Sequence, residues 1–75
     1  MNKYQREYFE RNVGLQTLFN AIKEKGSCEC MSLLPYIDNE AAWSDEILQN
    51  HLYSRLSLLN EFDLVKFDEN MVSVK

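Results

Sequence analysis

Polar side chains that can hydrogen-bond to a ligand cluster in a short stretch between residues 49 and 57. They are two amides, a phenol and two hydroxyls, at Gln49, Asn50, Tyr53, Ser54 and Ser57. Amide and hydroxyl groups of this kind contact base edges and phosphates in protein–DNA complexes. A helix face that is merely wetted by solvent would carry the same residue types. The residue types by themselves therefore leave both interpretations open.

Cys28, Cys30 and His51 are the other side chains with chemical potential. The two cysteines are too close in sequence for an easy disulfide with each other. Two thiols and one imidazole also fall short of the four ligands of a structural zinc site, and the C-x-C spacing is not the usual one. We expect reduced core thiols, a half-buried and hydrogen-bonded His51, and neither a metal nor a cofactor.

Catalytic motifs are not found in the sequence. It contains no phosphate-binding loop, dinucleotide fingerprint or nucleophile elbow. A lone histidine and scattered acids do not form a catalytic constellation. The sequence therefore predicts a protein that is not an enzyme.

A long helix positions the polar cluster. Ser44 is a typical N-cap, and Asp45 and Glu46 occupy the first turn, where the helix dipole favours acids. Apolar residues follow at helical spacing, at Ile47, Leu48, Leu52, Leu56, Leu59 and Phe62. On a helical wheel the face opposite these residues carries Glu46, Asn50, Tyr53, Ser54, Ser57 and Glu61. Arg55 falls within the apolar arc, where it either snorkels toward a carboxylate or marks a partner interface.

A β-hairpin follows this helix directly. Strand-type residues at 64–67 and 71–74 are separated by a polar turn at 68–70. The turn contains Asp68, Glu69 and Asn70, and no Lys or Arg is present at the tip.

The first half of the chain predicts three further helices. Residues 3–12 form an amphipathic helix whose aromatic side chains Tyr4, Tyr8 and Phe9 pack either on the body or on a second copy. A second helix runs through Leu15, Leu18, Phe19 and Ile22 and stops at Gly26. Whether it continues from the first helix or breaks at Gly14 is open.

The third of these helices is expected to start at Ser27 and to run through Cys28, Met31, Leu34 and Ile37. Pro35 must kink it or end it near Leu34, because the proline ring clashes with the carbonyl four residues back. A loop from Asp38 to Trp43 then leads to the long helix.

The segment from Arg55 to Val65 resembles the end of the recognition helix and the start of the wing in the winged-helix branch of the helix-turn-helix family. Leucines three apart are followed by a residue in the usual glycine place, here Asp63, and then by Leu64 and Val65. Asp enters the left-handed region more readily than most residues. The resemblance covers roughly residues 13 to 75.

This resemblance implies a mainly α fold with a C-terminal β-hairpin, a winged helix-turn-helix. Residues 1–75 would form a single domain, with 1–12 as an N-terminal helical extension. Two features depart from the family: the loop at 38–43 is longer than the tightest helix-turn-helix, and the wing tip has no basic residue.

Composition limits the range of partners. The chain has 75 residues and a net charge of −4, and its pI is about 4.8. Non-specific affinity for nucleic acid comes from clustered Lys and Arg, so this balance excludes a protein whose main role is to neutralise phosphates. No apolar run is long enough to span a bilayer, and the first residues lack a signal-peptide core. We expect a cytoplasmic location and no membrane contact.

Three functional hypotheses follow. The first is a transcriptional regulator that binds DNA as a homodimer, with Asn50, Tyr53, Ser54 and Ser57 in the major groove and Gln49 and Lys66 as supporting contacts. The second is a winged-helix module that binds protein, such as an accessory or inhibitory factor of a phage or mobile element. The third is a purely structural dimerisation unit.

Overall fold

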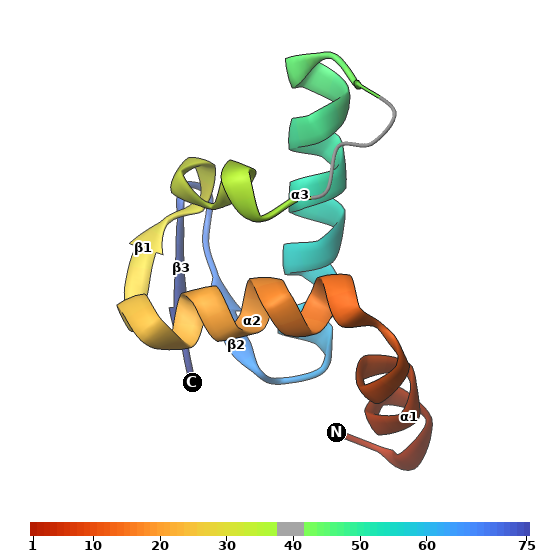
Figure 1. The fold of residues 1–75 in the computed structure, drawn as a ribbon. Coiled ribbons are helices and arrows are strands. Elements are labelled where there is room, and N and C mark those ends of the chain that lie inside the picture. Colours follow the sequence, from red (N-terminus) through yellow and green to blue (C-terminus); the bar gives the residue numbers. More distant parts are fainter. Residues whose placement is uncertain (38–41) are drawn as a thin grey trace.

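The computed structural model describes residues 1–37 and 42–75 and is mainly helical, with a small antiparallel sheet (Figure 1). Its helices are α1 (Lys3–Arg11), α2 (Val13–Lys25), the 3₁₀ helix η1 (Cys30–Tyr36) and α3 (Asp45–Glu61). Its strands are β1 (Ser27–Glu29), β2 (Val65–Phe67) and β3 (Met71–Val74). Most of the predicted loop from Asp38 to Trp43 lies outside the described residues.

Helices α1 and α2 form as predicted, and Asn12 separates them. Asn2 and Gln5 form a capping box at the start of α1, with a 2.8 Å bond from the Gln5 N–H to Asn2 Oδ1. Asn12 ends α1 and caps α2, because its side chain accepts a hydrogen bond from the Leu15 N–H at 3.0 Å. Gln16 donates from Nε2 to the carbonyls of Phe9 and Glu10. The chain therefore turns at Asn12 and not at Gly14.

The α-helix predicted from Ser27 is wrong. Residues Ser27–Glu29 form strand β1, which follows directly after Gly26, and a 3₁₀ helix takes over from Cys30 to Tyr36. Gly26 has φ of 75°, a backbone conformation that turns the chain out of α2. Pro35 lies inside η1, which ends one residue later, so the proline neither kinks nor prevents this short helix.

Helix α3 begins and ends with the predicted residues. The Ser44 hydroxyl accepts a hydrogen bond from the Ile47 N–H, and Asp45 and Glu46 occupy the first turn. At the other end Asp63 has φ of 64°, in the left-handed region predicted for it. The N–H groups of Asp63 and Leu64 donate to carbonyls of the last turn, which is the Schellman arrangement.

Asp63 also forms an ion pair with Lys75. The hydrogen bond and positive charge of Lys75 hold the pKa of the Asp63 carboxyl below its usual value of 3.8. The ion pair joins the turn after α3 to the end of β3.

The hairpin of β2 and β3 forms as predicted, and β1 adds a third strand. The order in the sheet is β1-β3-β2, with both pairs antiparallel. Cys28, Val72 and Phe67 occupy one row across the three strands. Because side chains alternate across a strand, this row shares the core face with Val65, whereas Lys66 points to the other face.

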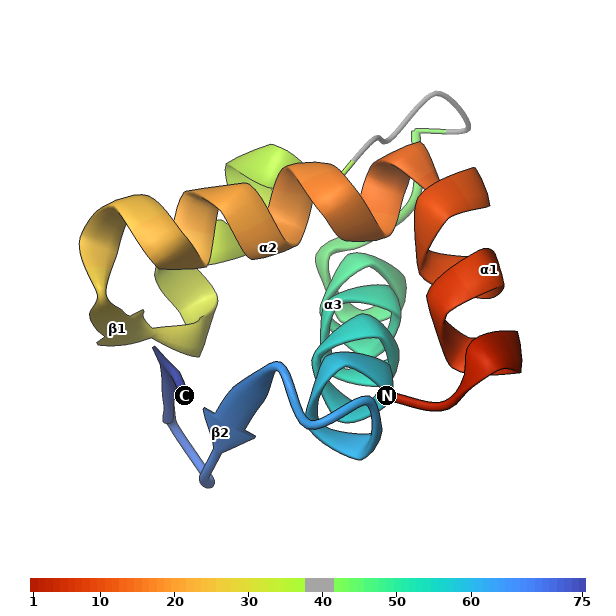
Figure 2. The same ribbon diagram turned by 90° about the horizontal axis from the view of Figure 1, so that it is seen from below.

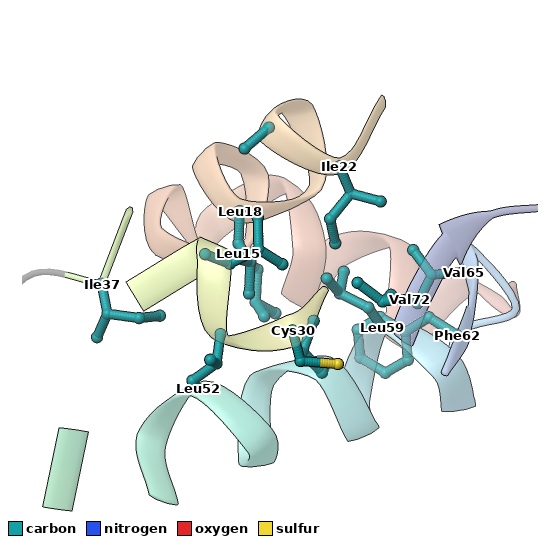
Figure 3. Packing of buried hydrophobic residues seen from close by; sticks show 13 residues of the cluster. Leu15, Leu18, Ile22, Cys30, Ile37, Leu52, Leu59, Phe62, Val65 and Val72 are labelled. Atoms are coloured by element: carbon teal, nitrogen blue, oxygen red, sulfur yellow. The ribbon is translucent and has the colours of Figure 1, made fainter. Parts of the chain in front are cut away.

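The core lies between α2, α3, η1 and the sheet (Figure 3). Most of its side chains are fully buried leucines, isoleucines and valines. The thirteen members are Leu15, Leu18, Ala21, Ile22, Cys30, Leu33, Ile37, Leu52, Leu56, Leu59, Phe62, Val65 and Val72. Neither α1 nor the hairpin tip contributes a buried residue, so both lie at the periphery of the packed unit.

Candidate interaction surface on α3 and the hairpin

Helix α3 presents one face to the core and the opposite face to solvent. Leu52, Leu56 and Leu59 are fully buried and hold the helix against the body. The first turns of α3 extend past η1 and α2 (Figure 1). The solvent face is therefore open along the helix.

A continuous stripe of exposed polar residues runs along this solvent face. Asn50, Ser54 and Ser57 are all exposed, at the i, i+4 and i+7 spacing that aligns side chains along a helix. Glu46 and Glu61 are exposed at the two ends of the same row. The structure thus brings together three of the predicted contact residues, and acids flank them. We call Asn50, Ser54 and Ser57 the polar stripe.

Gln49 and Tyr53 lie beside the stripe, on the edge toward the hairpin, and both are half-buried. The Tyr53 ring meets the Phe67 ring edge to face, with centroids 5.8 Å apart and an interplanar angle of 83°. Tyr53 was expected on the free outer face, but β2 occupies its flank. Its ring therefore joins α3 to the hairpin, and its role in contacting a ligand is limited to the exposed part.

Lys66 does not join the polar stripe. It is exposed on β2, between Val65 and Phe67, and pairs in register with Ser73. Since neighbouring side chains of a strand point to opposite faces, Lys66 lies on the sheet face that is turned away from the Phe67–Tyr53 contact. The predicted supporting contact is thus separated from the α3 residues.

The edge of the stripe away from the hairpin has an apolar element that the helical pattern did not reveal. Ile47 was expected in the apolar series facing the core, but its side chain is 44% exposed. It lines a shallow hollow with Asn50, His51 and Ser54. The ring of His51, half-buried as predicted, stacks on Trp43 with centroids 4.1 Å apart. Stacking on a residue outside the helix gave no signal in the sequence.

Arg55 does not add positive charge to the stripe. The side chain is half-buried, and its Nη1 atom is buried without a hydrogen-bond partner among the described residues. A methyl group built on Gly14 would lie 3.8 Å from the Arg55 Cζ, which shows how closely the guanidinium approaches α2. No carboxylate of residues 1–37 and 42–75 forms an ion pair with it, so the predicted acidic partner is not found there.

The cysteines are core thiols, as expected. Cys30 is fully buried, and burial, together with the nearby Cys28, raises the pKa of its thiol. Within the described parts of the chain no group of three or more potential metal ligands occurs. The thiols therefore contribute packing to the sheet and η1.

The aromatic residues of α1 divide between the body and solvent. Phe9 packs edge to face on Phe19, with centroids 5.7 Å apart, and Tyr8 approaches Phe62 in the same way at 6.0 Å. Tyr4 is 80% exposed and Tyr8 is 49% exposed. Of the two interpretations of this helix, packing on the body accounts for Phe9, and Tyr4 and Tyr8 stay available to a partner.

Comparison with protein-family models, with curated proteins and with solved structures finds no match for this chain. The winged-helix relationship therefore remains a prediction from the sequence and the arrangement of elements. None of the described helices is long and apolar enough to cross a membrane.

Proposed function

We propose that this protein is a small winged-helix DNA-binding regulator that acts as a homodimer and reads the major groove with the polar stripe of α3. The observation that carries the proposal is the stripe itself. Asn50, Ser54 and Ser57 are exposed in a row on the side of α3 opposite the core. Amide and hydroxyl groups at this spacing can contact successive base edges.

The arrangement of elements supports this use of α3. Helix α2, strand β1, η1, α3 and the hairpin follow one another, and the sheet order is β1-β3-β2, as expected of a winged helix. The outer face of α3 lies beside the hairpin, to which Tyr53 and Phe67 attach it. A groove-binding helix needs such a rigid support, because the contacts of its side chains depend on its orientation.

Charge limits how such binding would work. The exposed face of α3 carries Glu46 and Glu61 but no exposed Lys or Arg, and the hairpin tip carries Asp68 and Glu69. A protein that neutralises few phosphates releases few counterions, so its affinity depends weakly on salt. We therefore expect sequence-specific binding with a shallow salt dependence and little binding to random DNA.

The test is selection of binding sites from a random DNA library, followed by fluorescence anisotropy with the enriched site. Asn50→Ala should weaken binding roughly tenfold, the effect of losing one bidentate base contact. Asn20→Ala is the matched control, because Asn20 is an exposed amide on α2. Its affinity should equal that of the unchanged protein. If no sequence is enriched at about 50 mM salt, the proposal is wrong.

A second candidate function is protein binding through the same helix. The observation that favours it is the exposed Ile47 in a hollow with Asn50, His51 and Ser54, since an apolar centre with a polar rim is typical of protein interfaces. Acids at Asp45 and Glu46 would select a basic partner surface. Affinity capture with the unchanged protein and with Ile47→Asp separates the two functions: a protein partner lost in this variant, with no enriched DNA, would support this alternative.

A further inference from the structure

Helix α1 is attached to the body by only one of its sides. It has nine residues and none of them is buried. Two aromatic contacts, Phe9 with Phe19 and Tyr8 with Phe62, and the Gln16 side chain hold it in place. The side that carries Tyr4 has no comparable cover, and this tyrosine is the most exposed of the large hydrophobic residues described.

The open side of α1 has the spacing of a helix-packing seam. Tyr4, Glu7, Tyr8 and Arg11 stand at i, i+3, i+4 and i+7, which places them on one face. These four residues and Asn12 line a hollow on the surface. Two tyrosines framed by one acid and one base form an amphipathic surface that another helix could occupy.

The charges on this face complement a second copy of the same face. When two α1 helices pack antiparallel about a two-fold axis between Glu7 and Tyr8, each Tyr4 faces the Arg11 of the other copy. Each Glu7 then faces the other Tyr8 and lies one turn from the other Arg11. Arginine over a tyrosine ring and a carboxylate near a tyrosine hydroxyl or a guanidinium are favourable pairs. A two-fold interface requires such self-complementarity.

We infer that α1 is the homodimer interface of this protein, formed by antiparallel packing of Tyr4, Glu7, Tyr8 and Arg11 on the same residues of a second copy. The inference deepens the proposed function, on which it rests for the purpose of the dimer. It assigns that dimer to a surface which the core packing leaves uncovered.

The position of α1 leaves the proposed DNA-binding surface free. Both views show α1 on the side of α3 away from the sheet (Figure 1 and Figure 2). Tyr8 contacts Phe62, at the C-terminal end of α3, whereas the first turns of α3 extend in the other direction. A partner on α1 would therefore cover neither the hairpin tip nor the start of α3.

The length of α1 makes the expected dimer a weak one. Nine residues extend over roughly 14 Å of helix. A contact of this length is smaller than the standard interface of stable complexes. We therefore expect an equilibrium between monomer and dimer that depends on protein concentration.

Sedimentation equilibrium of the whole chain without DNA tests the inference. The mass should rise with concentration from 8.9 kDa toward twice that value. Glu7→Arg should weaken dimerisation about tenfold, because it places like charges across the axis. The double variant Glu7→Arg with Arg11→Glu exchanges both charges and should restore most of the association. Tyr4→Asp should abolish it.

Glu10→Arg is the matched control. Glu10 is exposed on α1 outside the seam, and its reversal changes the net charge by the same amount. It also places two arginines four residues apart, as Glu7→Arg does, so any loss of helix stability is matched. Circular dichroism verifies the fold of each variant, and Glu10→Arg should dimerise like the unchanged chain.

Two results would overturn the inference. One is a chain that stays monomeric at every concentration, which would assign the face to another partner or to none. The other is a dimer equally unaffected by Glu7→Arg and Tyr4→Asp, which would place the interface elsewhere. The DNA experiment is independent of both: a monomer that binds DNA overturns only the interface, and a dimer that ignores DNA overturns only the proposed function.

Discussion

Asn12 determines where the first two helices meet. Its side chain caps α2, while the Gln16 amide satisfies carbonyls at the end of α1. The sequence drew attention to Gly14 because glycine is the more common break in a helix. Asn is, however, a strong N-cap residue, and one cap hydrogen bond is sufficient to restart the helix at Val13. Gly14 therefore lies within the first turn of α2.

Gly14→Ala should stabilise the protein. A Cβ at this position would lie 3.4 Å from Asn12 Oδ1 and 3.8 Å from Arg55 Cζ, both ordinary contact distances. Alanine has the higher helix propensity, so we expect the free energy of unfolding to rise by roughly 0.5 kcal/mol. Urea unfolding measures the change. A decrease would mean that Arg55 cannot accommodate the methyl group.

Asp63 occupies a backbone conformation that disfavours most side chains, since its φ is 64°. Asp63→Ala and Asp63→Gly both remove the carboxylate that pairs with Lys75, so their comparison isolates the backbone. The glycine variant should have the higher urea midpoint, because glycine has no Cβ to clash in the left-handed region. Equal midpoints would contradict the role assigned to this conformation.

Among the elements, β1 and η1 account for the wrong prediction. The apolar spacing from Cys28 to Ile37 fits a helix, and part of it is indeed helical. The three residues of β1 are too few to show an alternating pattern, and their partner strand β3 lies more than forty positions further along the chain. Pairing over such a separation overrides local propensity, and a single sequence has no signal for it.

Helix α3 and the hairpin act as one element through Tyr53 and Phe67. Tyr53→Ala should lower the free energy of unfolding by about 2 kcal/mol, because it removes a half-buried ring and an aromatic pair. Tyr53→Phe keeps the ring and should keep the stability. If DNA affinity nevertheless falls in Tyr53→Phe, the hydroxyl contacts DNA. Thermal and urea unfolding, followed by anisotropy, separate these effects.

At the scale of the whole molecule, α1 is an appendage to a core that α2, η1, α3 and the sheet complete. All thirteen core residues lie outside α1. The other residues of the chain therefore contain the whole packed unit, and α1 is available for association.

Deletion of residues 1–11 should leave a folded protein. Asn12 remains to cap α2, and only the aromatic contacts to Phe19 and Phe62 are lost. We expect a loss of about 1–3 kcal/mol in the free energy of unfolding, from two aromatic pairs. Circular dichroism and urea unfolding check this result, and the shortened chain should sediment as a monomer. An unfolded product would show that α1 belongs to the structural core.

The sequence by itself determined the elements that depend on local physics: the caps of α3, the apolar period of α2 and α3, the left-handed Asp63 and the turn of the hairpin. Each depends on residues within a few positions of one another, so periodicity and capping chemistry suffice.

Only the tertiary structure decided which of the predicted contact residues lie together. It placed β1 beside β3, turned Lys66 away from α3, attached Tyr53 to Phe67 and exposed Ile47. The physical reason is that burial and register depend on neighbours distant in sequence, and the helical period gives only the direction of a side chain from its own axis.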